Sequence, residues 1–92
     1  MILSFKCADT AALFNGRRVA RFVNFEQVAM RKLAMLNRAQ TLNDLKVPPR
    51  NQLEALKRDR VGQHSIRISD QYRVCLRFDA GNVFDVEIVD YH

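Results

Sequence analysis

Residues 65–89 read SIRISDQYRVCLRFDAGNVFDVEIV, and this stretch decides the fold. Apolar and polar side chains alternate along three runs within it, at 65–69, 72–78 and 84–89. A period of two is typical of β-strands that bury one face. The sequence DAGN at 79–82 is a typical hairpin turn, and a second tight connection joins the first two runs. We therefore predict three consecutive strands in an antiparallel meander.

A helical period replaces this alternation further upstream. Apolar residues recur there three and four positions apart, namely Phe25, Val28, Ala29, Leu33 and Leu36. The pattern predicts an amphipathic helix from about 25 to 39. Asn24 fits its N-cap, and Gln27 stands where a capping box needs it.

Two shorter elements precede this helix. Residues 2–7 are predicted to form a short strand. Asp9 can cap a helix over residues 10–14. Asn15-Gly16 is a typical stop for that helix, because glycine readily adopts the positive φ with which many helices end.

The fold class follows from what has to be buried. Residues 40–52 are predicted to be a loop, since the prolines at 48 and 49 fit neither a helix interior nor a central strand. The apolar face of the meander needs a cover, and the amphipathic helix can supply it. We predict one α+β domain spanning residues 1–92. In it, two N-terminal helices pack on one face of a small curved, mainly antiparallel sheet.

Composition narrows the class of protein. A chain of 92 residues suits one domain, and 48% hydrophobic with 27% charged residues excludes a disordered tail, a collagen-like repeat and a membrane protein. The N-terminal apolar run is too short for a signal peptide, so we expect a cytoplasmic location. We expect Cys7 and Cys75 to be buried or half-buried free thiols, because two cysteines make a poor disulfide framework. The alternatives are a disulfide, or a metal site that would also use His64 or His92, although no pair has ligand spacing.

Basic side chains give the chain a net charge of +5 and point to a polyanionic partner. If the apolar residues of each strand face the helices, Arg67, Arg73 and Arg77 face the other way together with Cys75 and Tyr91. Guanidinium and phenol groups on an open sheet face suit an RNA backbone and a splayed base. The alternative is that such arginines are solvated or pair with carboxylates across the strands. Composition and alternation thus predict a basic domain that binds RNA or DNA.

Motifs along the whole chain resemble the HigB-type toxins of the RelE/ParE superfamily. The matching residues are Ser4-Phe5-Lys6, Leu13-Phe14-x-x-Gly16, Leu53-x-x-Leu56-Lys57, Arg60-x-Gly62, Ser65-Ile66-x-Ile68, Tyr72-Arg73-Val74, Phe78-x-x-Gly81 and Asp90-Tyr91-His92. The combination of Tyr-Arg, a hairpin and a terminal Asp-Tyr-His is the most specific part of this resemblance.

The resemblance implies a toxin of a type II toxin–antitoxin pair that binds the ribosomal A site and cuts mRNA there without a metal or cofactor. The ribose 2′-OH would attack the adjacent phosphate and leave a 2′,3′-cyclic phosphate and a 5′-OH. Arg73 would then stabilise charge on the phosphate. Tyr91 would stack on or orient the nucleotide, and His92 would transfer a proton. Asp90 would position one of these groups.

The same resemblance implies the partners. A basic surface would hold ribosomal RNA, and it consists of Lys57, Arg58, Arg60 and Arg67, together with Arg17, Arg18 and Arg21. A small helix-turn-helix antitoxin (HigA-like) would bind the toxin, and the pair would bind its own operator DNA.

Two departures from the family pattern bear on activity. Glu54 stands where relatives often carry a histidine or another basic residue, and Arg58 stands where relatives have glycine. Glu54 could act as the base, but a carboxylate near a phosphate is unfavourable, so we expect weaker cleavage. Two other functions are left open: a non-catalytic, ParE-like inhibitor of DNA gyrase, and a plain basic RNA-binding module.

Overall fold

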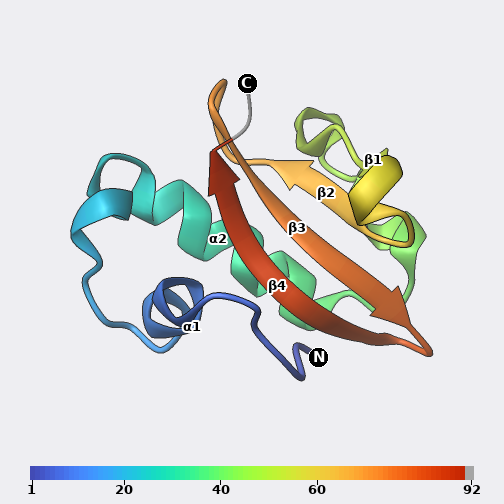
Figure 1. Cartoon of the computed structure of the whole chain (residues 1–92), viewed down its shortest axis with the longest axis horizontal. Coiled ribbons are helices and arrows are strands. Elements are labelled where there is room, and N and C mark those ends of the chain that lie inside the picture. Colours follow the sequence, from blue (N-terminus) through green and yellow to red (C-terminus); the bar gives the residue numbers. More distant parts are fainter. Residues whose placement is uncertain (91–92) are drawn as a thin grey trace.

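A computed structural model describes residues 1–90 of the chain, so Tyr91 and His92 lie outside the described residues (Figure 1). The helices are α1 (Ala8–Phe14) and α2 (Glu26–Arg38), and the strands are β1 (Glu54–Ala55), β2 (His64–Arg67), β3 (Tyr72–Asp79) and β4 (Asn82–Asp90). Four short 3₁₀ helices connect them, namely η1 (Ala20–Phe25), η2 (Leu42–Lys46), η3 (Pro49–Asn51) and η4 (Arg58–Arg60). No helix within residues 1–90 is long and apolar enough to cross a membrane.

The sheet has the order β1-β2-β3-β4, and every neighbouring pair is antiparallel. The predicted meander is therefore confirmed as β2, β3 and β4. The two-residue strand β1 extends it at one edge, and the alternation had not indicated this strand. At the other edge, the expected strand at 2–7 is reduced to isolated parallel bridges from Ile2 to Val83 and from Phe5 to Val86.

One extra residue in β4 reverses the face of the sheet to which each side chain in the first half of this strand points. Cys75 pairs with Glu87, whereas Arg77 pairs with Phe84, so one residue of β3 lies opposite two residues of β4. This β-bulge contains Asp85, whose φ of 55° lies in the left-handed region. Alternation with Val86 and Ile88 predicts that Phe84 faces the helices, and this prediction is wrong because Phe84 lies opposite Arg77 on the other face. Val83 fills the core instead and is fully buried.

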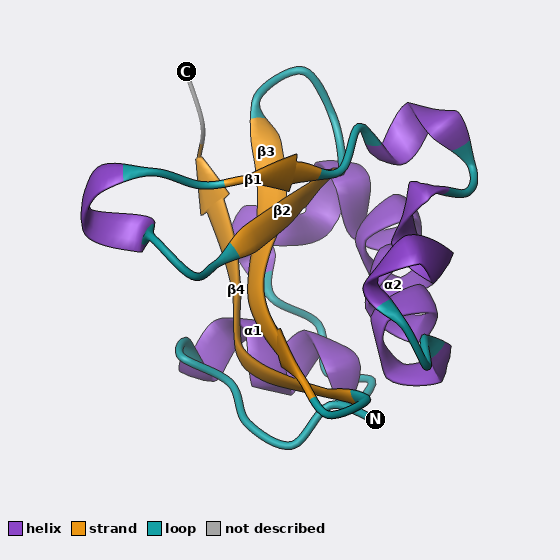
Figure 2. Cartoon of the chain, turned by 90° about the vertical axis from the view of Figure 1, so that its right-hand side faces the viewer, coloured by secondary structure: helices purple, strands orange, loops and turns teal. Residues whose placement is uncertain are grey.

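Helix α2 covers one face of the sheet, and the predicted α+β layering is confirmed (Figure 2). The buried residues of this core come from both helices, the linker and the strands: Leu13, Phe22, Ala29, Leu33, Leu36, Ala39, Leu45, Ile66, Ile68, Val74, Leu76, Val83, Val86 and Ile88. Burial of these side chains is the main favourable term in folding a chain of this size. The face of the sheet that points away from α2 is called the outer face below.

The predicted helix caps are only partly right. Phe25, not Asn24, is at the N-cap of α2, and no side chain caps that end because Asn24 lies within η1. Likewise, α1 begins after Cys7, and Asp9 lies in its first turn instead of capping it. The predicted stop at Gly16 is confirmed, since this glycine has a φ of 86° and its N–H donates to the Leu13 carbonyl at 3.0 Å.

Both cysteines are free thiols, Cys75 buried and Cys7 half-buried, as the sequence predicted. Burial raises the pKa of Cys7, but hydrogen bonds from the backbone and hydroxyl of Thr10 and the backbone of Asp9, with the charge of Arg21, outweigh it. The net pKa of this thiol is lower than usual. Burial raises the pKa of Cys75 above its ordinary value. The two thiols therefore have opposite chemical character.

We predict that replacing Asp85 by valine destabilises the fold by about 1–2 kcal/mol, because β-branched residues tolerate the left-handed conformation poorly. Asp85→Asn is the matched control, since asparagine adopts this conformation readily. The control also removes the ion pair of Asp85 with Arg77, which is half exposed and contributes at most about 1 kcal/mol. Urea denaturation of both variants measures the difference, and equal midpoints would contradict the prediction.

Candidate functional site

The outer face of the sheet brings together Arg67, Arg73 and Cys75, which sequence alternation had assigned to it, whereas Tyr91 lies outside the described residues. Arg67 pairs with Arg73 across β2 and β3, and Arg73 pairs with Val89 of β4. The next row in the same direction contains Ser65, Cys75 and Glu87. Because residues directly opposite one another project to the same side of a sheet, these two rows share the outer face.

Arg73 is buried, not open to solvent as predicted. Only 6% of its surface is exposed. Its Nε donates to the Ser65 hydroxyl at 2.8 Å, and its Nη2 donates to the carbonyl oxygens of Ser65 and Gln52. Gln52 has a left-handed conformation with a φ of 46°, just before β1. The acceptor from Gln52 is therefore a backbone group, which side-chain alternation could not reveal.

Glu54 lies next to this guanidinium group. Its Oε1 is 3.8 Å from Nη1 of Arg73, and its side chain is about half exposed. A half-exposed ion pair contributes little to stability. Its larger effect is on charge, because the carboxylate reduces the positive potential that an approaching anion meets at Arg73.

A second guanidinium–carboxylate pair lies on the same face. Arg60 Nη1 is 3.2 Å from Oε1 of Glu87 and 3.2 Å from the side-chain oxygen of Gln63. Arg60 was predicted to bind RNA, and the structure pairs it with a carboxylate of β4. Arg67 also has a carboxylate partner, Asp70. Cross-strand pairing, the alternative considered for the strand arginines, applies to Arg77, whose Nε is 3.3 Å from Asp85 of β4, whereas Arg67 pairs locally.

Asp90 ends β4 at the same end of the sheet as Arg73. It pairs with Tyr72, the residue before Arg73, and its carboxylate accepts a hydrogen bond from Gln71 at 3.2 Å. The predicted residues Arg73 and Asp90 thus lie in adjacent rows of one sheet. The predicted residues Tyr91 and His92 follow Asp90 directly in the chain and lie outside the described residues.

The predicted basic surface consists of two separate groups. Lys57 and Arg58 are exposed where the chain enters η4, on the outer side of the sheet. Arg17, Arg18 and Arg21 lie on the connection between α1 and α2, on the other side of the molecule (Figure 1). The structure does not bring these two groups together.

Arg21 is the most constrained residue of the second group. Its Nε is 2.8 Å from Asp9, its Nη2 donates to the Cys7 sulfur at 3.3 Å, and its guanidinium carbon lies 4.6 Å from the centre of the Phe22 ring. These contacts hold the connection against α1. The ion pair is about half exposed, so its stabilising contribution is small.

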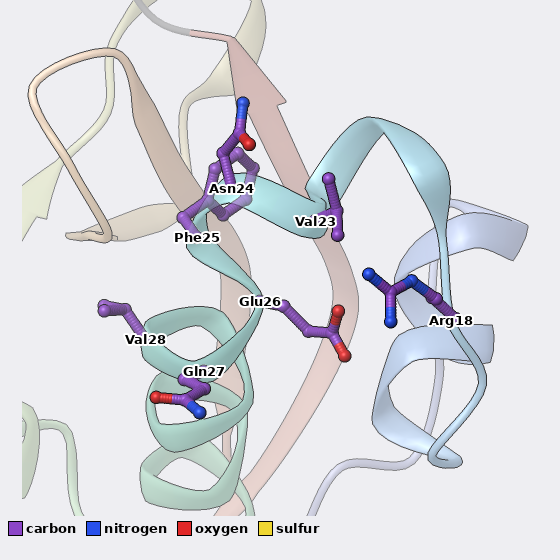
Figure 3. A pocket seen from close by; sticks show the side chains of 7 residues that line it. All are labelled: Arg18, Val23, Asn24, Phe25, Glu26, Gln27 and Val28. Carbon is purple, nitrogen blue, oxygen red and sulfur yellow. The ribbon is translucent and has the colours of Figure 1, made fainter.

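A cleft of about 430 Å³ lies where η1 meets α2 (Figure 3). Its lining residues are Arg18, Val23, Asn24, Phe25, Glu26, Gln27 and Val28. The side chains of Arg18 and Glu26 point toward one another across it. A neighbouring cleft of about 310 Å³ extends from Arg21 and Phe25 to Gln71 and Tyr72, beside the end of β4. Sequence reasoning missed both clefts because it interpreted Asn24 as a helix cap.

The described residues offer no obvious metal centre. No three His, Cys, Asp or Glu side chains within residues 1–90 are close enough together to hold a metal ion. The chemical groups that the outer face does offer are a fixed guanidinium, two carboxylates beside arginines, and a buried thiol.

Comparison with known sequences identifies the family. Residues 15–92 match the family described as "RelE-like toxin of type II toxin-antitoxin system HigB". The chain belongs to this family. Toxin HigB-1 of Vibrio cholerae serotype O1 is 38% identical over 83 residues, which cover 88% of this chain and 87% of that protein. An uncharacterized protein of Haemophilus influenzae is 35% identical over 60 residues, covering 65% of this chain and 59% of that protein.

A solved structure shares the fold of this HigB-family toxin. The crystal structure of YafQ from E. coli strain BL21(DE3) matches with a TM-score of 0.57 at 13% identity, covering 98% of this chain and 91% of that one. The resemblance to HigB-type toxins inferred from the sequence motifs is therefore confirmed, and so is the RelE-like fold. As a toxin of a type II system, the protein has an antitoxin as its partner.

We predict that Ser65→Ala destabilises the toxin by about 1–3 kcal/mol, because it removes a buried acceptor from the Arg73 Nε–H. Ser69→Ala serves as the control. The Ser69 hydroxyl accepts from the backbone N–H groups of Gln71 and Tyr72 in a half-buried turn, so its loss should cost less. Urea denaturation measures both, and a Ser65→Ala variant as stable as the wild type would contradict the burial of a charged donor at this position.

Proposed function

We propose that this toxin is a ribosome-dependent endoribonuclease that cuts mRNA in the A site. The ribose 2′-OH attacks the adjacent phosphate and leaves a 2′,3′-cyclic phosphate and a 5′-OH, without a metal ion. Family membership supports this activity. The observation that carries it is the Arg73 guanidinium, which Ser65 and Gln52 hold in one orientation on the outer face.

Arg73 stabilises the charge that develops on the scissile phosphate. A fixed guanidinium is effective because it needs no reorganisation when charge appears in the transition state. Nη1 of Arg73 lies 3.8 Å from Oε1 of Glu54, so a phosphate that binds this guanidinium comes close to the carboxylate. The planar guanidinium suits phosphate oxygens better than a lysine ammonium would.

The end of the chain supplies the other catalytic groups. Asp90 pairs with Tyr72, the residue before Arg73, at the end of β4. By the family resemblance, Tyr91 stacks on or orients the substrate nucleotide, and His92 transfers the proton. Asp90 positions one of these two groups.

The two basic groups contact RNA at different distances from the cut. Lys57 and Arg58 lie on the outer side with Arg73, and we assign them to mRNA and nearby 16S ribosomal RNA, together with Arg60 and Arg67. Arg17, Arg18 and Arg21 contact ribosomal RNA farther away. Such contacts act mainly through charge and weaken as salt rises. Because ribosomes translate mRNA in the cytoplasm, we assign this activity to the cytoplasm.

The antitoxin is proposed to be a small HigA-like helix-turn-helix protein. The toxin–antitoxin pair then binds its own operator DNA, as the resemblance implies.

Primer extension on a defined mRNA with purified 70S ribosomes tests the proposed cleavage. Wild-type toxin should produce cuts inside the A-site codon, only with ribosomes and also in EDTA. Arg73→Ala should reduce the rate by about 10²–10³-fold, the usual loss when one transition-state donor is removed. Arg77→Ala is the matched control, because it removes the same charge from an exposed position on the same strand.

Because Arg73 is buried, thermal denaturation must show that the Arg73→Ala protein is folded at the assay temperature. Cleavage by folded Arg73→Ala at the wild-type rate would contradict the role of this residue. Growth arrest with intact mRNA and DNA-damage signalling would instead favour the gyrase inhibitor.

We predict that Glu54→Gln raises the cleavage rate by a few-fold. The charge of Glu54 competes with phosphate for Arg73, and a half-exposed ion pair amounts to at most about 1 kcal/mol. Single-turnover primer extension measures the effect, with Glu87→Gln as the control on the other carboxylate of the outer face. A fall of about 100-fold or more would instead make Glu54 the general base, since that loss is typical of removing one.

A further inference from the structure

Lys32 is a buried cation on the opposite side of the sheet from the outer face. Its residue surface is only 7% exposed, and it lies among the core residues of α2. Its Nζ donates to the side-chain oxygen of Asn51 at 2.5 Å. Within residues 1–90, no ion pair includes Lys32. Burial lowers its pKa, and the charges of Arg31 and Arg67 lower it further.

Asn51 connects this lysine to the linker. It is fully buried, and its Nδ2 donates to the carbonyl oxygens of Leu45 at 3.1 Å and Val47 at 3.4 Å. The single amide group therefore fixes α2, η2 and the end of the linker relative to one another. A fully buried amide with all these contacts has one allowed position.

Gln52 follows Asn51 directly, and its carbonyl is an acceptor for Nη2 of Arg73. Gln52 has a φ of 46° and a ψ of 57°, which turns the chain from η3 toward β1. The chain runs here from the α2 side of the sheet to its outer side (Figure 2). The position of the Gln52 carbonyl thus depends on the anchoring of the residue before it.

We propose that Lys32 and Asn51 are positioning residues for Arg73. They hold the Gln52 carbonyl in place from behind the sheet, and this carbonyl with Ser65 fixes the guanidinium on the outer face. The inference goes beyond the proposed nuclease activity, because it concerns the orientation of Arg73 whatever reaction Arg73 serves. Only its kinetic readout rests on the proposed function.

The energetics favour this role over a purely stabilising one. A buried lysine loses much of its hydration, and no carboxylate among residues 1–90 compensates for it. An apolar side chain at position 32 would avoid this cost in a core position of α2. What the apolar side chain cannot supply is the donor to Asn51.

The test is the exchange rate of the Arg73 Nε–H with water, measured by ¹⁵N NMR and assigned by its absence in Arg73→Lys. In the wild type this proton is protected by its hydrogen bond to Ser65. We expect Lys32→Met and Asn51→Ala to speed its exchange about tenfold, corresponding to ~1.4 kcal/mol. Ile88→Val is the control, a buried truncation of modest cost on another strand, and it should leave the exchange within about threefold of wild type.

Lys32→Leu provides a second variant in case Lys32→Met does not fold. It also removes the donor to Asn51, so it should speed the exchange as Asn51→Ala does. Exchange at the wild-type rate in folded Lys32→Leu would overturn the role of Lys32. Unchanged exchange in both Lys32→Met and Asn51→Ala, with reduced stability, would overturn the whole proposal.

Ribosome cleavage kinetics supply the second readout. We expect Lys32→Met to lower kcat while KM stays near wild type, since RNA binding rests on the exposed basic groups. Faster Arg73 exchange together with wild-type kcat would overturn the link to catalysis and leave the positioning intact. If wild-type toxin makes no cuts at all, the proposed nuclease fails, but the NMR result still decides whether Lys32 and Asn51 position Arg73.

Discussion

Burying the guanidinium group of Arg73 is the constraint on which the outer face depends. A charged side chain with 6% exposure requires acceptors around it, because an unsatisfied buried charge costs several kcal/mol. Ser65 supplies its hydroxyl and carbonyl, and Gln52 supplies a second carbonyl. These acceptors reach β3 because of how the preceding chain is arranged. It makes a left-handed turn at Gln52 and continues through the two-residue strand β1 and the 3₁₀ helix η4.

The layers of the fold were predictable because they follow from side-chain periods. A period of two predicted strands β2 to β4 and placed Arg67 and Arg73 on one face of the sheet. A helical period predicted α2. The burial of Arg73 was not predictable, because its Gln52 acceptor is a backbone carbonyl in an irregular segment. The predicted cap at Asn24 was wrong for a related reason. The residues before α2 already form a 3₁₀ turn, so this side chain does not stand at a helix start.

Charge on this toxin is distributed differently from what net charge suggests. The three arginines of the sheet have carboxylate partners nearby, namely Arg67 with Asp70, Arg73 with Glu54 and Arg77 with Asp85, and so does Arg60 of η4, with Glu87. Within residues 1–90, no ion pair includes Lys57, Arg58, Arg17 or Arg18. The same holds for Lys6, Arg31, Arg38, Lys46 and Arg50, so the long-range positive field is spread around the molecule. In the proposed mechanism, the outer face recognises the phosphate mainly through the fixed geometry of Arg73.

The bulge at Asp85 sets the facing of everything that follows it in β4. Val83 and Val86 both face the core although two residues lie between them, because the bulge takes up the extra one. Val86 and Ile88 therefore reach the core, while Glu87 and Val89 share the face of Arg73. Loss of Asp85 would remove the bulge and leave the pairs Arg77–Phe84 and Cys75–Glu87 with one residue between them on each strand, so both halves of β4 would keep their facing. An extra or missing residue between Val86 and Asp90 has no such compensation and would exchange the buried and exposed sides of the strand end, so the hairpin can change length at Asp85 more readily than near the end of β4.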